Sequence, residues 1–381
     1  MPNYYEFFAG AGMARAGLGE QWKCLFANDF DHKKAVTYRT NWGDGELCVK
    51  DIGKLTLREI PGQADLVWAS FPCQDLSLAG GGAGLRGERS GTFRPFWKLM
   101  TGLISEGRAP KAIVLENVCG ALTSHGGKDF ATLCGSLVAG GYAVGAVVVD
   151  AAHFLPQSRP RLFIIGVNNG TEIPIDVIDT TARLPWHSAS LVRAFRSLPI
   201  NIQRQWIWWK LPPASGSRLC LANVIDESGS VPPWFSDDET QRLLQMMAPL
   251  HRAKVEKALR YGKRVVGSVY KRTRPRSDGN REQRAEIRFD GVSGCLRTPA
   301  GGSSRQLIVI VEDQRVKVRL ISARETARLM GLEDTYILPE NYNEAYHLTG
   351  DGVVVPAVRH IAEHILRPLA SAPACEVEAA A

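Results

Sequence analysis

The sequence predicts an α/β protein, built on a mostly parallel sheet and carrying a second, smaller domain. Short apolar runs alternate with helical segments over the first 167 residues, which is the pattern of parallel strands joined by helices. Several runs end in glycine, acidic residues or cysteine, at the edge where open α/β sheets bind ligands. After Asn168-Asn169-Gly170 the chain becomes richer in Pro, Trp and Arg, and we expect a second domain there.

The composition indicates a large folded protein without a membrane segment. Its 381 residues are 45% hydrophobic, enough for two domains of roughly 100–200 residues each. No stretch reaches the ~18 apolar residues of a membrane helix, and the N-terminus lacks a signal-peptide pattern. The eight cysteines contain no Cys-x-x-Cys pair, which argues against disulfides or zinc. We expect a cytoplasmic protein with reduced thiols and no metal.

The first predicted strand, residues 4–8, leads through Gly10 and Gly12 into a helix. Glycines at such a turn let a ligand approach the backbone, and the helix N-terminus offers free N–H groups. The dinucleotide fingerprint needs a third glycine where Arg15 stands. We therefore do not expect NAD or FAD; a nucleoside ligand and a plain packing turn both remain open.

Two further strand ends carry similar groups. The second strand, residues 24–27, ends before Asp29 and Phe30, where a carboxylate commonly holds a ribose and an aromatic ring can stack on a base. Asp51 and Ile52 repeat the arrangement. Each aspartate alone could be an ordinary helix cap, but three successive strand ends of this kind favour a cofactor crevice.

The apolar run 65–71 ends in Pro72 and Cys73, which predicts a buried strand that delivers one thiol to the sheet edge. The glycine-dense stretch after it is expected to form a mobile lid, with Arg86 and Arg89 available for phosphates. Taken alone, Cys73 could equally be a buried structural cysteine.

Beyond a helix at 92–104, the strand 111–115 ends at Glu116. Apolar neighbours are expected to desolvate this carboxyl group and raise its pKa toward general-acid use; a structural glutamate is the alternative.

The strands predicted at 141–149 and 161–167 are joined by a turn that contains Arg159 and Arg161. Paired guanidiniums suit a phosphate or a polarised carbonyl group, and surface ion pairs are the alternative.

A basic segment lies between His251 and Arg288, with thirteen lysines and arginines against four acidic residues. It predicts a polyanionic partner, although a solvated surface would also fit. A single helix is expected at 236–260. We expect DNA contacts from this segment and from the glycine-serine loop after Cys295, where arginine can reach a groove. The residues expected to contact DNA here are Lys271, Arg272, Arg274, Arg297 and Arg305.

Towards the C-terminus we expect strands at 307–311 and 316–320, a helix that stops at Gly331, a helix at 357–366 and a disordered tail from 371. His360 and His364 lie four residues apart, but no third ligand accompanies them.

Taken in order, these motifs resemble the DNA (cytosine-5)-methyltransferases of bacterial and phage restriction-modification type. The resemblance covers residues 4–167 and about 307–368, and the segment between, about 185–300, corresponds to the variable target-recognition region of that family. Its motifs are Phe8-Ala9-Gly10-Ala11-Gly12, Pro72-Cys73-Gln74, Glu116-Asn117-Val118, Gln157-x-Arg159-x-Arg161, Arg319 through Gly331, and Gly350 through Val355. The last motif departs from the family pattern, since Asp351 replaces an asparagine.

The resemblance implies a Rossmann-like class I S-adenosylmethionine-dependent methyltransferase sheet, with residues 1–180 and 337–381 in the catalytic domain and 181–336 in a small target-recognition domain. Cys73 would add to C6 of a flipped-out cytosine, Glu116 would hold N3, and Arg161 with Arg159 would assist at the carbonyl. The cofactor S-adenosylmethionine would contact Phe8, Gly10, Gly12, Asp29, Phe30, Asp51 and Ile52, with Pro72 and Val353 closing the pocket.

The implied partner is double-stranded DNA, with a cognate restriction endonuclease as a further potential partner, and we expect a monomer. Two alternatives stay open. One is the tRNA-methylating branch that shares these motifs, and the other is a non-catalytic DNA-binding relative.

Overall fold

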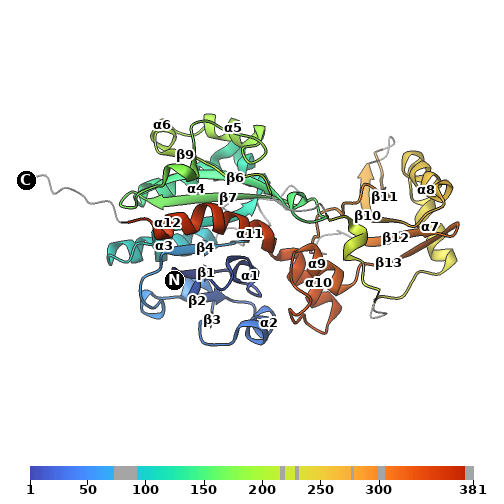
Figure 1. The fold of residues 1–381 in the computed structure, drawn as a ribbon, viewed down its shortest axis with the longest axis horizontal. Coiled ribbons are helices and arrows are strands. Elements are labelled where there is room, and N and C mark those ends of the chain that lie inside the picture. The colour runs from blue at the N-terminus through green and yellow to red at the C-terminus, as the bar shows by residue number, and fades with distance from the viewer. Residues whose placement is uncertain (73–91, 215–218, 228–230, 276–278, 299–304, 374–381) are drawn as a thin grey trace, which may run out of the picture. The chain divides into compact units, whose positions relative to one another are not determined.

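The computed structural model describes residues 1–72, 92–214, 219–227, 231–275, 279–298 and 305–373, which divide into two compact units (Figure 1). The larger unit comprises Met1–Asp150, Pro160–Ala214 and the chain from Val353 onward, and the smaller one comprises Ala151–Arg159 and Ser215–Gly352. No described helix is long and apolar enough to cross a lipid bilayer.

These boundaries differ from the predicted ones. Residues 181–214 belong to the larger unit because Trp206–Trp209 forms a strand that extends its sheet. Residues 151–159 and 337–352 belong to the smaller unit. The composition change at Asn168 therefore lies well before the point at which the chain leaves the large sheet.

The larger unit is built on a nine-stranded sheet in the order β3-β2-β1-β4-β5-β7-β6-β9-β8. The strands β1 to β5 run parallel, whereas β7 is antiparallel to both of its neighbours. The bounds are β1 Asn3–Phe7, β2 Lys23–Asp29, β3 Leu47–Val49, β4 Leu66–Ala69, β5 Ala112–Val118, β6 Tyr142–Asp150, β7 Pro160–Asn168, β8 Ile178–Asp179 and β9 Trp206–Trp209. The predicted α/β class is confirmed. The strands β6 and β7 pair as the expected hairpin, but they do not close the sheet, because β9 and β8 continue it beyond β6.

The clearest amphipathic helix of this unit is α3, which buries one apolar stripe in the main core. On α3, Phe93, Phe96, Met100 and Leu103 recur at helical spacing and join the main core. The bounds are α1 Met13–Leu18, α2 His32–Trp42, α3 Phe93–Ser105, α4 Lys128–Ala139, α5 Ala189–Arg196, α6 Ile200–Gln203, α11 Val355–Ile361, a π-helical turn Ala362–Leu366 and α12 Arg367–Ser371. The predicted C-terminal helix is thus a longer composite of three segments.

The smaller unit contains a four-stranded antiparallel sheet in the order β11-β10-β12-β13. Its strands are β10 Val265–Pro275, β11 Arg281–Arg288, β12 Leu307–Glu312 and β13 Arg315–Leu320, and its helices are α7 Asp237–Gln245, α8 Pro249–Tyr261, α9 Ala323–Leu329 and α10 Tyr342–Asp351. Helices α7 and α8 share an apolar core with alternate residues of all four strands. The strands β12 and β13 match the predicted pair.

The basic segment folds differently from the prediction. The expected single helix at 236–260 is two helices, because Pro249 occupies the first turn of α8 and cannot continue α7. The strands β10 and β11 were not predicted, since their exposed positions are almost all polar or charged. The basic residues therefore occupy both a helix and a hairpin.

Candidate active site

The loop after β1 has the backbone of a ligand site. Phe8, Gly10 and Gly12 all lie at positive φ, with values of 58°, 56° and 77°. A bulky residue such as Phe8 adopts this left-handed region rarely, and such strain clusters at ligand sites. The sequence singled out the glycines, but not the strain at Phe8.

Two contacts hold this glycine loop in place. The Asp29 carboxylate accepts the Gly10 N–H at 2.7 Å, and the Trp42 indole N–H donates to the carbonyl of Ala11 at 3.1 Å. A Cβ built on Gly12 would lie 2.3 Å from the Trp42 nitrogen. Glycine at position 12 is therefore required both by its φ and by the close approach of α2.

The predicted cofactor residues on β2 and after β3 differ in exposure. Asp29 is buried, which raises its pKa, while Lys34 and the N–H groups of Asp31 and Gly10 act in the opposite direction. Phe30 is 65% exposed, so its ring is accessible to a planar ligand.

After β3, Asp51 caps a short 3₁₀ turn by accepting the Gly53 N–H at 2.7 Å, and Ile52 is buried in the core. Asp51 is exposed and acts as a helix cap, which was the alternative considered for it in the sequence.

A buried acidic group beneath the loop was missed by sequence reasoning. Glu6, on β1, is 1% exposed, and its Oε2 has no hydrogen-bond partner in the described structure. Burial raises the pKa of Glu6 to about 8, against the lowering effect of Arg15. Arg15 itself bonds to the Tyr38 hydroxyl at 2.9 Å and lies over the Trp42 ring. An acidic residue inside an apolar strand was the available signal.

At the end of β4, the described chain reaches Pro72, which is half-buried. Cys73, Arg86 and Arg89 lie outside the described residues. The backbone just before Pro72 is anchored by Asn117, whose side-chain amide donates to the carbonyl of Phe71 at 3.2 Å. Asn117 belongs to a motif singled out in the sequence, but this positioning contact was not foreseen.

Glu116 and Arg161 meet on neighbouring antiparallel strands. The Arg161 Nε lies 3.4 Å from the Glu116 Oε1, and both side chains are nearly buried. In the register of β5 and β7, Val118 faces Arg161 and Glu116 faces Phe163, so the pair is diagonal across the ladder. The sheet therefore brings together two of the predicted catalytic residues and gives the carboxyl group an adjacent cation.

Arg159 has contacts of a different kind. It belongs to the smaller unit, is 1% exposed and donates to the carbonyl groups of Leu296, Gly350 and Gly352 at 2.7–2.8 Å. Gln157 is also fully buried and bonds to the backbone of Leu296 and Leu329. These contacts are those of a structural clamp, whereas the sequence placed Arg159 beside Arg161 at the substrate.

The departure in the last motif has a local partner. The Thr298 hydroxyl donates to the Asp351 carboxylate, so an anion is accommodated where the family pattern has an amide. Two residues further on, Val353 is buried in the larger unit.

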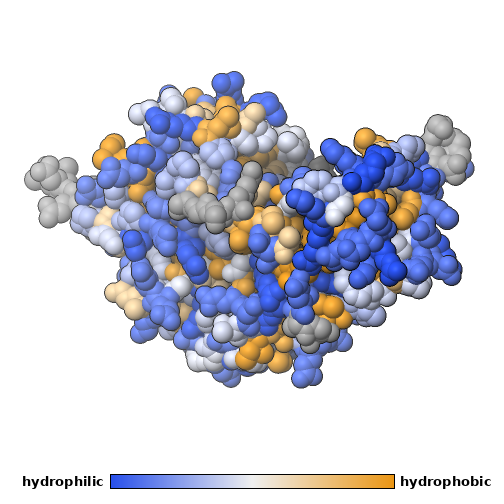
Figure 2. Space-filling model, turned by 45° about the vertical axis from the view of Figure 1, so that its right-hand side comes forward, coloured by the Kyte–Doolittle hydropathy of each residue, from blue (hydrophilic) through white to orange (hydrophobic). Residues whose placement is uncertain are grey.

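The arginines expected to contact DNA are partly engaged within the smaller unit. Arg272 and Arg274, both exposed on β10, pair with Glu286 of β11 at 3.5 and 2.6 Å. Arg305 bonds to Asn343, whereas Arg297 is exposed. Lys271, also on β10, is half-buried. Figure 2 shows hydrophilic side chains gathered over the smaller unit, on the right of the view.

Two other sequence features are structural. The Trp209 ring is buried, and Trp206 and Trp208 form an aromatic cluster with Phe195. His360 Nε2 lies 3.0 Å from the Pro212 carbonyl oxygen. Within the described ranges, no group of three or more His, Cys, Asp or Glu side chains could hold a metal ion.

Comparison with known proteins identifies the family of this chain. The model of the family described as C-5 cytosine-specific DNA methylase matches residues 3–367. The type II methyltransferase M.HpaII of Haemophilus parainfluenzae is 24% identical over 389 residues, covering 96% of this chain and 89% of that protein. M1.ScrFI of Lactococcus lactis subsp. cremoris is 27% identical over 367 residues, covering 96% and 78%. M.BsuFI of Bacillus subtilis is 36% identical over 165 residues, 43% of this chain and 38% of that protein.

Solved structures share the fold. The S. pombe Dnmt2 methyltransferase superimposes with a TM-score of 0.60 at 15% identity, covering 97% of this chain and 99% of that one. Spodoptera frugiperda DNMT2 gives 0.59 at 16%, with the same coverage. The predicted fold class and family are both confirmed, and the chain belongs to the C-5 cytosine-specific DNA methylases, the enzymes that methylate cytosine at C5 in DNA.

Proposed function

We propose that this protein transfers a methyl group from S-adenosylmethionine to C5 of a cytosine flipped out of a specific duplex sequence, through a covalent bond between Cys73 and C6. The observation that carries the proposal is the family match over residues 3–367. The pairing of Glu116 with Arg161 at the sheet edge supports it.

The residues at the carboxyl edge fit the cofactor. The glycine loop holds Phe8, Gly10 and Gly12 at positive φ, as ligand sites often do, and Phe30 exposes a ring for an adenine. The Asp29 carboxylate accepts two backbone N–H groups, which leaves lone pairs on both oxygens for a ribose. When bound, S-adenosylmethionine would supply an electrophilic methyl group, with Asp51, Ile52, Phe8, Pro72 and Val353 around it.

The reaction needs activation of the base, because C5 of cytosine is a poor nucleophile. Addition of the Cys73 thiolate at C6 would make the ring an enamine that is nucleophilic at C5, and protonation at N3 would assist the addition. After methylation, loss of the C5 proton to a base would expel the thiolate from C6 and restore the aromatic ring. Glu116 would hold N3 and Arg161 the adjacent carbonyl. Asn117, by fixing the Phe71 carbonyl, would position the backbone that carries Cys73. Flipping the base costs a few kcal/mol, which contacts to DNA must offset.

Arg159 has a different role in this proposal from the one expected from sequence. Because its guanidinium is buried against three carbonyl groups of the smaller unit, it acts as a positioning residue. Arg161 is then the arginine that contacts the substrate.

The smaller unit would read the target sequence. The hairpin β10–β11 places Lys271, Arg272 and Arg274 on one basic element, and Arg297 and Arg305 flank the glycine-serine segment. Arginine side chains bind phosphates and read guanine in grooves. Arg86 and Arg89 complete the proposed contacts. Because the relatives M.HpaII and M1.ScrFI are named type II methyltransferases, we also propose that a cognate restriction endonuclease accompanies this enzyme.

The test is methylation of mixed-sequence duplex DNA with labelled cofactor, followed by bisulfite sequencing to find the target. Wild-type protein should produce 5-methylcytosine at one sequence and Cys73→Ser none. Equal labelling by both proteins would contradict the covalent route.

Two further substrates separate the alternatives. DNA containing 5-fluorocytosine should form a covalent adduct with the wild type in the presence of cofactor, and no adduct is expected from a non-catalytic relative. Methylation of tRNA in preference to duplex DNA would instead favour the tRNA branch.

A further inference from the structure

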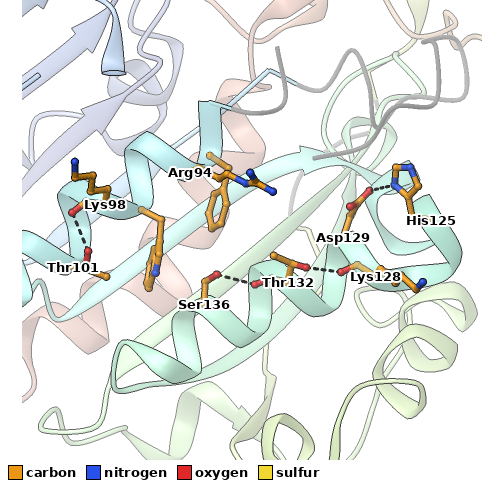
Figure 3. A pocket seen from close by; sticks show the side chains of 10 residues that line it. Arg94, Lys98, Thr101, His125, Lys128, Asp129, Thr132 and Ser136 are labelled. Atoms are coloured by element: carbon orange, nitrogen blue, oxygen red, sulfur yellow. Dashed lines mark hydrogen bonds and ion pairs between the residues drawn. The ribbon is translucent and has the colours of Figure 1, made fainter. Parts of the chain in front are cut away.

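A cavity between α3 and α4 in the larger unit belongs to neither the cofactor loop nor the Glu116–Arg161 pair. Its volume is about 710 Å³, within the roughly 300–1,000 Å³ typical of small-molecule sites. Figure 3 shows side chains of the two helices lining it from opposite sides. The lining residues are Phe93, Arg94, Trp97, Lys98, Thr101, His125, Lys128, Asp129, Thr132 and Ser136.

Three cations surround this cavity. Arg94 extends into the space between the helices, whereas the side chains of Lys98 and Lys128 lie at opposite ends of the lining and point out of it (Figure 3). None of the three forms an ion pair within the part of the chain that the structure describes. Asp129, the carboxylate among the described lining residues, is instead engaged by the His125 ring at 2.9 Å and the Ser124 hydroxyl. The arrangement favours a ligand with more than one negative charge, since flexible lysine stems can close on it.

One wall of the cavity is aromatic and fixed. The rings of Phe93 and Trp97 are stacked, with an interplanar angle of 16° and centroids 6.1 Å apart. Gly140 ends α4 at an ordinary φ of −82°, so its backbone does not require glycine. A Cβ there would lie 2.9 Å from the Trp97 ring. Glycine at this position therefore makes room for the indole, and a planar ligand can pack against the aromatic wall.

The hydroxyl groups of the lining offer acceptors. Thr101, Thr132 and Ser136 each donate to a backbone carbonyl of their own helix at 2.8–2.9 Å. A hydroxyl has one donor and two lone pairs, so these oxygens can only accept from a ligand. Amino and ring N–H groups of a nucleobase are suitable donors.

We propose that this cavity binds a nucleoside phosphate, with its phosphates at Arg94 and Lys98, which are one helical turn apart on α3, and its base along Trp97. The same chemistry is offered by a free nucleotide and by a nucleotide within a single strand. The site is separate from methyl transfer, because its residues are not those of the glycine loop or of the catalytic pair.

The experiment measures binding of ATP and of a short single-stranded oligonucleotide by calorimetry, with and without saturating S-adenosylhomocysteine. Because the cofactor site also accepts adenosine, binding at the new site must persist in the presence of that compound. The double variant Arg94→Glu/Lys98→Glu should weaken binding at least tenfold. The matched control Arg58→Glu changes an exposed arginine of the same unit away from the cavity and should bind as the wild type does.

Two further variants test the aromatic wall without changing any charge. Trp97→Leu should weaken ATP but leave pyrophosphate unchanged, since only the base is stacked. Gly140→Ala should weaken ATP by displacing Trp97 without removing any lining residue. The relative affinity of ATP and oligonucleotide identifies the source of the ligand.

The proposal is overturned if neither ligand binds, if S-adenosylhomocysteine abolishes all binding, or if the charge-reversal variant binds as the control does. Methylation activity is assayed separately, so a failure here is distinguishable from a failure of the proposed chemistry.

Discussion

The two units differ in how well the positions of their functional residues can be predicted from the sequence. In the larger unit, short segments at strand ends, such as Gly10–Gly12 and Glu116–Asn117, form local sites whose geometry follows from the sheet edge. In the smaller unit, a conspicuous basic segment folds into a hairpin in which Arg272 and Arg274 are already paired with Glu286. A motif at a strand end can therefore be placed at the sheet edge from the sequence. The number of basic residues in a segment, by contrast, does not indicate which of them are free to bind DNA.

The largest effect is expected at Gly12 in the glycine loop, where two variants distinguish a steric clash from backbone strain. Gly12→Ala should weaken S-adenosylhomocysteine binding more than a hundredfold, because the new Cβ would meet Trp42 at 2.3 Å. Gly126→Ala is the matched control, since Gly126 has a similar backbone conformation, with φ 67° and ψ 30° against 77° and 36° at Gly12, but nothing within 4 Å of its Cβ. Calorimetry on both variants is the measurement, and equal loss in both would refute the role of the Trp42 contact.

The two arginines of one turn give the next largest effect. Arg159→Ala should lower the free energy of unfolding by about 3 kcal/mol or more, because three buried carbonyl groups lose their donor. Arg161→Ala should leave the melting temperature within a few degrees and reduce kcat at least a hundredfold. Thermal denaturation and single-turnover methylation distinguish them. A reversal of the two phenotypes would mean that Arg159 is the substrate contact.

Buried Glu6 predicts a pH dependence of stability. Its folded pKa of about 8 lies above the ordinary glutamate pKa of 4.5, so the folded state retains a proton that the unfolded state releases. Stability contributed by neutral Glu6 is therefore fully present below about pH 4.5 and is lost as the pH rises towards 8. Glu6→Gln should match the wild type at pH 5 and be more stable at pH 8.5, by an amount on the order of a few kcal/mol.

Denaturant melts at the two pH values provide the measurement. A difference between wild type and Glu6→Gln that did not grow with pH would show that Glu6 is ionised in the folded protein.

The smallest effect concerns the hairpin. Glu286→Gln should release Arg272 and Arg274 and tighten binding to non-specific DNA several-fold at low salt. The slope of log affinity against log salt should steepen by about 1 for each added phosphate contact. Fluorescence anisotropy between 50 and 200 mM salt measures both. Unchanged affinity and slope would show that these arginines do not reach phosphates.

Strand ends were predictable because apolar runs and the residues that end them are local features. The predicted strands at 4–8, 111–115 and 161–167 match β1, β5 and β7 within a few residues. The hairpin β10–β11 could not be predicted, because its exposed face carries charges that a solvated loop would also carry. The helix at 236–260 was wrong for a reason visible in the sequence, the proline at 249.

The sequence by itself determined the family and the residue types at the site, because the order of the motifs can be recognised without a structure. Only the tertiary structure separated Arg159 from Arg161. Two residues apart on a strand they would share one face, but β7 begins at Pro160, so Arg159 precedes the strand. Its guanidinium donates to the carbonyl groups of residues 296, 350 and 352. Contacts between such distant residues depend on packing, and no local pattern encodes them.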